Sequence, residues 1–360
     1  MANIYDYIKW RGDLSFGESE FNEVDGAVLS QFAYAPFEKM SYRYPISLNE
    51  AAARLSKLKN LEDAVLFRGD AKLIYSLIDS RRFADMEITS FVNRSDEERQ
   101  TQFCALTYKF ARGIYLITFR GTDDTLIGWK EDFNMSFTFP VGAQIEAVSY
   151  FENIAKKHPS AKYILCGHSK GGNLAVYAAA FCKARYQNKI IKVYNYDGPG
   201  FGEGMLESEG YKRIKDRTET FVPQSSIVGM VLEHEEDYTV IHSSAAENGI
   251  LQHEMYSWET ESRAFAHLGG VTKKSQIIDK TLKAWIADMD FKRREEFVDA
   301  LFSVLSETNA KTITDLNKNG FKNTAGILKA VNHLDNKTKT MLFEVLSKLV
   351  KAAAENIMQK

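Results

Sequence analysis

Between residues 101 and 260, short apolar runs alternate with segments of helical spacing, and this alternation limits the possible folds more than any other feature of the chain. The apolar runs lie at 103–108, 114–119, 163–166, 190–194, 220–222 and 238–241, and the helical patterns at 146–157 and 174–184. Strands that alternate with helices predict a mostly parallel sheet with helices on both faces. Arg112-Gly113, between the first two runs, predicts a hairpin.

One predicted strand leads directly into a serine flanked by glycines. The segment Gly167-His168-Ser169-Lys170-Gly171 follows the run at 163–166 and precedes an Ala-rich helix. A Gly-x-Ser-x-Gly segment between a strand and a helix is typical of the nucleophile turn of the α/β-hydrolase fold. A Cβ at position 167 or 171 would collide with the tight turn or the neighbouring strand. The sequence therefore predicts an α/β-hydrolase fold with Ser169 as its nucleophile.

A serine nucleophile needs a base, and in this fold the chain order is serine, then acid, then histidine. His253 follows the last predicted strand through a polar loop that contains glycine, which is where the base is expected. His242, at the end of that strand, is the main rival, and His333 lies far away in the tail. His168 is not the expected base, because adjacent residues of such a turn point apart.

Further residues before Ser169 resemble the class 3 (fungal type) lipases. These are the run Thr118-Phe119-Arg120-Gly121-Thr122, the following Trp129 and Asp132, and the later Gly-His-Ser-x-Gly-Gly. The resemblance covers about 100–260 and implies that Thr122 stabilises the oxyanion through its backbone and its hydroxyl. The alternative for Thr122 is a helix N-cap after a glycine turn. The backbone N–H of Lys170 is the other expected oxyanion donor.

The same resemblance implies that residues 123–135 act as a lid. Four apolar residues of this segment are candidates for the lid and the acyl pocket: Leu126, Ile127, Trp129 and Phe133. These side chains favour a lipid-like substrate, although the same residues could instead pack the core.

The chain is closer still to a bacterial family of uncharacterised lipase-like α/β-hydrolases. The shared segments are Asp6-Tyr7-x-x-Trp10-Arg11-Gly12-Asp13, the run 221–229 (FVPQSSIVG), and the step Gln252-His253-Glu254. This resemblance extends over most of the chain, including the helical tail.

The acid is the least defined member of the predicted triad. In class 3 lipases it follows the penultimate strand, and the matching place around Ser226 has no carboxylate. Asp197 ends the preceding strand, followed by Gly198-Pro199-Gly200, in the arrangement of pancreatic-type lipases. We expect Asp197 to be the acid, with an ordinary turn-forming aspartate as the alternative. The other candidates stand just before the last strand: Glu233, Glu235, Glu236 and Asp237.

The pattern divides the chain into three zones. Residues 1–100 are expected to form a mainly helical segment packed on the core, 101–268 the α/β-hydrolase core, and 269–360 a helical appendage. Apolar stripes at helical spacing support the last zone: Phe297, Leu301, Val304 and Leu305, then Met341, Val345, Leu346 and Leu349.

The composition excludes several other classes of protein. The formal net charge of −2 gives no basic excess, so no nucleic-acid partner is expected. The three cysteines stand in apolar stretches without zinc-ligand spacing, so we expect reduced core residues, no metal and no cofactor. The N-terminus lacks a signal-peptide pattern and no stretch is long and apolar enough to span a bilayer, which together predict a cytoplasmic protein.

The expected activity is hydrolysis of carboxylic esters through an acyl-enzyme, with a lysophospholipid or an acylglycerol among the candidate substrates and transient contact with a membrane surface. A thioesterase or an amidase would use the same residues. The alternative from another class is a non-catalytic lipase-fold protein for binding, which the missing carboxylate near Ser226 would favour.

Overall fold

The computed structural model describes residues 1–41, 43–84, 86–234, 237–245, 249–306, 311–312, 331–345 and 347. The chain forms two compact units. The first consists of 1–94, 103–121 and 143–272, and the second of 95–102, 122–142 and 273–360. The second unit therefore includes residues 122–142, which the sequence pattern had grouped with the core.

A nine-stranded sheet organises the first unit, in the order β1-β2-β3-β4-β5-β6-β7-β8-β11. Strands β4 to β8 are parallel to one another, whereas β3, β1 and β11 pair antiparallel with β4, β2 and β8. The bounds are β1 Ile46–Ser47, β2 Glu87–Asp96, β3 Thr101–Ala111, β4 Ile114–Phe119, β5 Lys162–His168, β6 Ile190–Tyr196, β7 Thr218–Pro223, β8 Tyr238–Ile241 and β11 His267–Leu268. A separate hairpin pairs β9 Thr260–Glu261 with β10 Ala264–Phe265.

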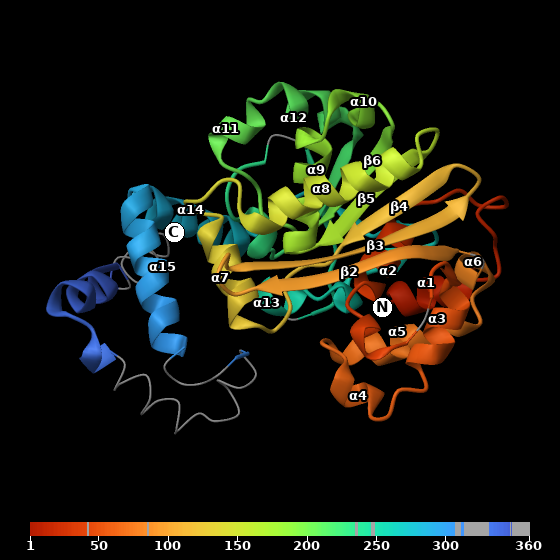
Figure 1. The fold of residues 1–360 in the computed structure, drawn as a ribbon, viewed down its shortest axis with the longest axis horizontal. Coiled ribbons are helices and arrows are strands. Elements are labelled where there is room, and N and C mark those ends of the chain that lie inside the picture. The colour runs from red at the N-terminus through yellow and green to blue at the C-terminus, as the bar shows by residue number, and fades with distance from the viewer. Residues whose placement is uncertain are drawn as a thin grey trace. The chain divides into compact units, whose positions relative to one another are not determined.

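The N-terminal helices cover one face of this sheet (Figure 1). They are α1 Ile4–Arg11, α2 Glu23–Phe32, α3 Leu48–Leu55, α4 Leu61–Ala64, α5 Arg68–Ile78 and α6 Arg81–Ala84. Helix α2 is buried from Val24 to Phe32 and contacts β4, β5 and β6. Asn22 accepts the N–H groups of Val24 and Asp25, and the Asp25 carboxylate accepts the N–H of Asn22, so a capping box fixes where α2 begins.

Helices on the other face are α8 Gly142–Lys157, α9 Lys170–Phe181, α10 Ala184–Gln187, α11 Glu203–Leu206 and α12 Glu209–Ile214. The side chains of β5 alternate between the two cores. Ile164 and Cys166 pack with the N-terminal helices, while Tyr163 and Leu165 pack with α8 and α9. This period of two, with both faces covered, is the reason why the strand reads as one continuous apolar run. The α/β-hydrolase fold is thereby confirmed.

The second unit has its own small core, built on α7 Leu126–Asn134, α14 Lys273–Ala287 and α15 Phe291–Ser306. Leu126, Phe297 and Val345 are buried in it. Within this unit Lys130 pairs with Asp299 at 2.7 Å. Leu346 and Leu349, predicted to continue the last apolar stripe, lie outside the described residues. The remaining short elements are α13 Gly249–Gln252 and the 3-10 turns Phe37–Lys39, Lys215–Arg217, Val228–Met230 and Met255–Ser257.

Strand β2 is the main element that the sequence pattern did not predict, since it falls in the zone expected to be mainly helical. Only Ile88 of this strand is fully buried. A strand of that kind has neither a continuous apolar run nor a strict alternation, so its hydrophobic signal is weak. The predicted strands of the core and the hairpin at Arg112-Gly113 are all present.

Candidate active site

Ser169 lies in the turn between β5 and α9, with φ 59° and ψ −135°. A positive φ is uncommon for a residue with a Cβ and costs about 1–3 kcal/mol. The Ser169 N–H donates to the Tyr196 carbonyl at 2.9 Å, which ties the turn to the end of β6. A Cβ at Gly171 would lie 2.0 Å from the Phe119 oxygen, and one at Gly167 would lie 2.3 Å from Gly171. The expected need for glycine at both positions is confirmed.

Asp197 and His253 are joined by a hydrogen bond of 2.6 Å between Oδ2 and Nδ1. Asp197 directly follows β6 with φ 50°, and its side chain is fully buried, whereas that of His253 is 17% exposed. Since the carboxylate only accepts, a neutral His253 carries its hydrogen on Nδ1 and its lone pair on Nε2. In that tautomer Nε2 can take a proton from a hydroxyl group.

Two further donors hold the other oxygen of Asp197. Ser226 donates from Oγ to Oδ1 at 2.5 Å, and the Gly229 N–H donates to the same oxygen at 3.1 Å. Such charge-assisted bonds stabilise the ionised carboxylate and fix its orientation. In the sequence, Ser226 stands out only as a place without an acid. The contact depends on the pairing of β6 with β7, for which the sequence carries no local signal.

The structure gathers Ser169, Asp197 and His253 at the carboxyl ends of the parallel strands. A Cβ at Gly198 would lie 2.6 Å from the backbone carbonyl oxygen of Ser169, so the turn after Asp197 lies against the nucleophile turn. In the part of the chain that the structure describes, neither Ser169 Oγ nor His253 Nε2 has a hydrogen-bond partner. A direct bond between nucleophile and base is often long or absent without substrate, so this separation is compatible with a shared role.

The rival histidines have other surroundings. His242 Nδ1 is 2.6 Å from the Glu259 carboxylate, and the exposed His333 belongs to the second unit. Neither is bonded to Asp197.

Among the alternative acids, Glu233 pairs through its backbone with Phe201, and Asp237 precedes β8. Glu235 and Glu236 lie outside the described residues. The carboxylate that the structure places on His253 is that of Asp197.

Thr122 belongs to the second unit, where its hydroxyl donates to Asp132 Oδ2 at 2.5 Å. The N-cap alternative for Thr122 is wrong, because Thr125 is the N-cap of α7 and accepts the Gly128 N–H at 3.2 Å. Lys170 is the first residue of α9, and its side chain is buried.

The predicted lid residues divide into two groups within α7. Leu126 is buried in the core of the second unit. Ile127 is half-buried, whereas Trp129 and Phe133 are 41% and 37% exposed. Exposed aromatic side chains on one helix are candidates for contact with an apolar ligand or surface.

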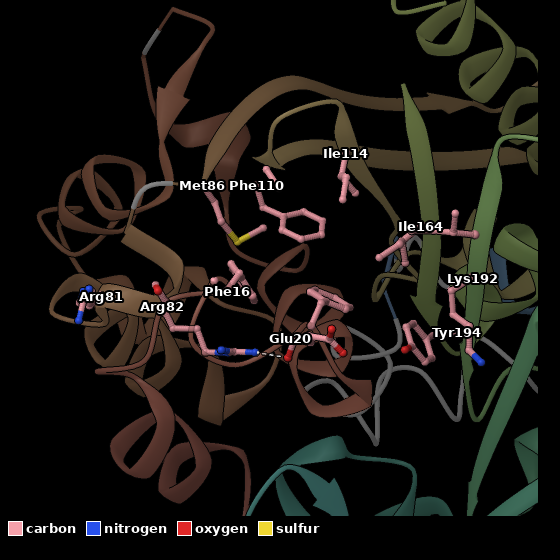
Figure 2. A pocket seen from close by; sticks show the side chains of 15 residues that line it. Phe16, Glu20, Arg81, Arg82, Met86, Phe110, Ile114, Ile164, Lys192 and Tyr194 are labelled. Carbon is pink, nitrogen blue, oxygen red and sulfur yellow. Dashed lines mark hydrogen bonds between the residues drawn. The ribbon is translucent and has the colours of Figure 1, made fainter. Parts of the chain in front are cut away.

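A cavity of about 710 Å³ in the first unit contains none of the predicted site residues. It is lined by Phe16, Phe110 and Met86 and by residues near the amino ends of β4 and β6 (Figure 2). Ser169 follows the carboxyl end of β5, which is the opposite end of the parallel strands. The Arg82 side chain at its edge is bound to Asp25 and to three backbone carbonyls. This cation is therefore already paired within the protein.

Within the described residues, no group of three or more His, Cys, Asp or Glu side chains is placed to hold a metal ion. The three cysteines are buried and not in disulfides, as expected, and burial raises the pKa of the Cys166 thiol to about 12. None of the helices in the described ranges has both the length and the apolar character needed to cross a membrane.

Comparison with protein families gives a match to the family described as Mbeg1-like over residues 77–303, which is 227 of the 360 residues. Comparison with curated proteins gives no significant match.

Solved structures that resemble the chain include fungal lipases at low identity. The mono- and diacylglycerol lipase from Aspergillus oryzae is 15% identical, with 70% of this chain and 88% of that chain covered and a TM-score of 0.40. For the lipase from Rhizopus microsporus var. chinensis the identity is 14%, the coverage is 61% and 75%, and the TM-score is 0.37. For the Rhizomucor miehei lipase propeptide complex the corresponding values are 14%, 66%, 80% and 0.37.

Proposed function

Since the chain belongs to the Mbeg1-like family of lipase-like α/β-hydrolases, we propose that it is a serine hydrolase that cleaves carboxylic esters. The observation that carries the proposal is the 2.6 Å hydrogen bond between Asp197 and His253, beside a serine held at positive φ between β5 and α9. A buried carboxylate on Nδ1 of a histidine is what a general base for a serine hydroxyl requires.

In the proposed reaction, Ser169 Oγ attacks the ester carbonyl while His253 Nε2 takes the hydroxyl proton. The ester C–O bond then breaks, and His253 returns this proton to the leaving alcohol, which gives an acyl-enzyme on Ser169. Water repeats the sequence, with His253 as base and then acid, and releases the carboxylic acid. The Asp197 carboxylate stabilises the imidazolium between the two transfers.

The backbone N–H of Lys170, at the start of α9, remains our proposed oxyanion donor. Thr122, the other donor that the sequence predicts, belongs to the second unit, where its hydroxyl donates to Asp132, and its role in the oxyanion site stays a prediction. Loss of one such donor raises the barrier by about 3 kcal/mol in comparable sites.

A non-catalytic binding protein is the second candidate, and the serine at position 226 was its main support. The contact of Ser226 with Asp197, and of Asp197 with His253, favours the hydrolase instead. A thioesterase or an amidase would use the same three side chains. Assays that compare esters, thioesters and amides are therefore needed to identify the leaving group.

A fluorophosphonate probe tests the proposal directly. We expect the folded protein to form a stoichiometric covalent adduct on the peptide that contains Ser169, and to release a burst of nitrophenol from short-chain nitrophenyl esters. Protein unfolded in guanidinium should not react, and Ser76→Ala, which removes an exposed hydroxyl on α5, should react like the wild type. A folded wild-type protein that forms no adduct would refute the hydrolase assignment.

The proposed substrates are lipid-like esters, such as a lysophospholipid or an acylglycerol, taken from a membrane or micelle surface that the protein contacts transiently. Trp129 and Phe133 support this choice through their exposure on α7. We expect Trp129→Ser combined with Phe133→Ser to reduce kcat/KM for dodecanoyl esters about tenfold and that for butanoyl esters less than about twofold, because only long chains need the apolar contact.

A chain-length series of nitrophenyl esters measures this effect. Phe343→Ser, which removes an exposed phenylalanine of the second unit outside α7, is the matched control. An equal loss of kcat/KM for short-chain and long-chain esters would show that the two aromatic residues do not select for acyl length.

A further inference from the structure

His168, next to the proposed nucleophile, is buried and bonded at both ring nitrogens. Its Nε2 lies 2.8 Å from the His253 carbonyl oxygen, and its Nδ1 lies 3.2 Å from the Tyr34 hydroxyl. The imidazole rings of His168 and His253 are also 4.4 Å apart between centroids. The contact with His253 is therefore made both to its backbone carbonyl and to its ring.

The hydrogens of these bonds can be assigned. A carbonyl oxygen only accepts, so Nε2 of His168 carries a hydrogen. Burial holds the pKa of His168 well below its usual range, so the ring is neutral and Nδ1 is an acceptor. The Tyr34 hydroxyl then donates to Nδ1, with the His168 carbonyl as a longer second acceptor at 3.4 Å. The Tyr34 oxygen in turn accepts the Gly121 N–H at 3.1 Å.

These bonds form one directed chain from Gly121 through Tyr34 and His168 to the carbonyl of His253. It connects four parts of the first unit that are distant in sequence: the segment after α2, the segment after β4, the end of β5, and the segment after α13. A ring held only through its bond to Asp197 could still shift with its backbone. The bond from His168 fixes that backbone at a second point, which limits the positions that the ring can take.

We propose that Tyr34 and His168 are positioning residues, which hold the backbone of His253 so that its imidazole stays in place between Asp197 and Ser169. The inference rests on the proposed hydrolase function for its kinetic consequence. Its structural consequence, an ordered His253 ring bonded to Asp197, can be measured without any substrate.

The test compares His168→Leu, which removes the donor, with His168→Gln, whose side-chain amide can still donate to the His253 carbonyl. With nitrophenyl butyrate we expect His168→Leu to lower kcat about 10- to 100-fold with KM nearly unchanged, because positioning acts on the transition state. The kcat of His168→Gln should stay within about threefold of the wild-type value, and that of Tyr34→Phe should fall by about three- to tenfold.

Proton NMR supplies a readout that does not depend on activity. The Nδ1–H of His253, bonded to the buried Asp197, should give a resolved low-field signal that is lost in His253→Ala. We expect this signal to persist in the wild type and in His168→Gln, and to broaden in His168→Leu. The matched control is His158→Leu, which breaks another tyrosine–histidine bond of 3.2 Å, that with Tyr115 at the start of β4.

The outcomes separate the two proposals. A wild-type protein with the low-field signal but without esterase activity or probe labelling would refute the hydrolase function alone. An active wild type whose kcat and low-field signal are unchanged in both His168→Leu and Tyr34→Phe would overturn the positioning role. Equal losses of kcat and of melting temperature in His168→Leu and His168→Gln would also overturn it, since they would indicate packing alone. If His168→Leu fails to fold, Tyr34→Phe decides.

Discussion

Ser169→Ala is expected to reduce kcat for nitrophenyl esters by about 10⁶-fold and to abolish the burst of nitrophenol. The substitution removes only the side-chain hydroxyl, and without this hydroxyl no acyl-enzyme can form. In the described part of the chain Ser169 Oγ has no hydrogen-bond partner, so its removal leaves no buried group unsatisfied. The free energy of unfolding should therefore change by less than about 0.5 kcal/mol.

Steady-state kinetics and urea unfolding on the same preparation check both parts of this prediction. Ser76→Ala serves again as the matched loss of one hydroxyl. Hydrolysis by Ser169→Ala within tenfold of the wild-type rate would mean that the serine between β5 and α9 is not the nucleophile.

Asp197→Asn is expected to lower kcat by about 10⁴-fold while the fold is kept. The asparagine amide would donate to His253 Nδ1, so the ring would carry its hydrogen on Nε2 and could no longer accept a proton from Ser169. The side chain keeps its size, and its oxygen can still accept from Ser226 and Gly229. The loss should therefore appear in catalysis rather than in stability.

Asp237→Asn is the matched control, since it makes the same change at a rival acid before β8 and should leave kcat within about twofold of the wild type. Circular dichroism would check that both variants fold. Unchanged activity in Asp197→Asn would move the role of acid to the segment 233–237.

In the Asp197→Asn background, Ser226→Asp should raise kcat again by about tenfold or more, because the Ser226 hydroxyl lies within 2.5 Å of the carboxylate to be replaced.

The sequence predicts the parts of this fold whose signals are local. The strands β3 to β8 read as apolar runs because they are buried, and the glycines at 167 and 171 mark the turn because a Cβ would collide there. Asp197 and His253 could be nominated from their places after predicted strands together with the order serine, acid, histidine, and the structure brings them within hydrogen-bonding distance.

Other features depend on packing between distant segments and have no such signal. Ser226 reaches Asp197 because β6 and β7 are neighbours, and Tyr34 reaches His168 because α2 ends against the sheet beside β5. Strand β2, with a single fully buried residue, lacks the apolar pattern of the other long strands. The assignment of residues 122–142 to the second unit likewise follows from contacts with residues after 273 rather than from composition.

The backbone at Ser169 and Asp197 has a thermodynamic consequence. Both have positive φ values, 59° and 50°, although neither is glycine. Each such conformation lowers the stability of the folded chain by about 1–3 kcal/mol, which the buried contacts of β5 and β6 with α2 and α9 must offset. Selection for thermal stability alone would thus favour glycine at these two positions. If both act as proposed, the chain gives up folding free energy to keep these two side chains in place.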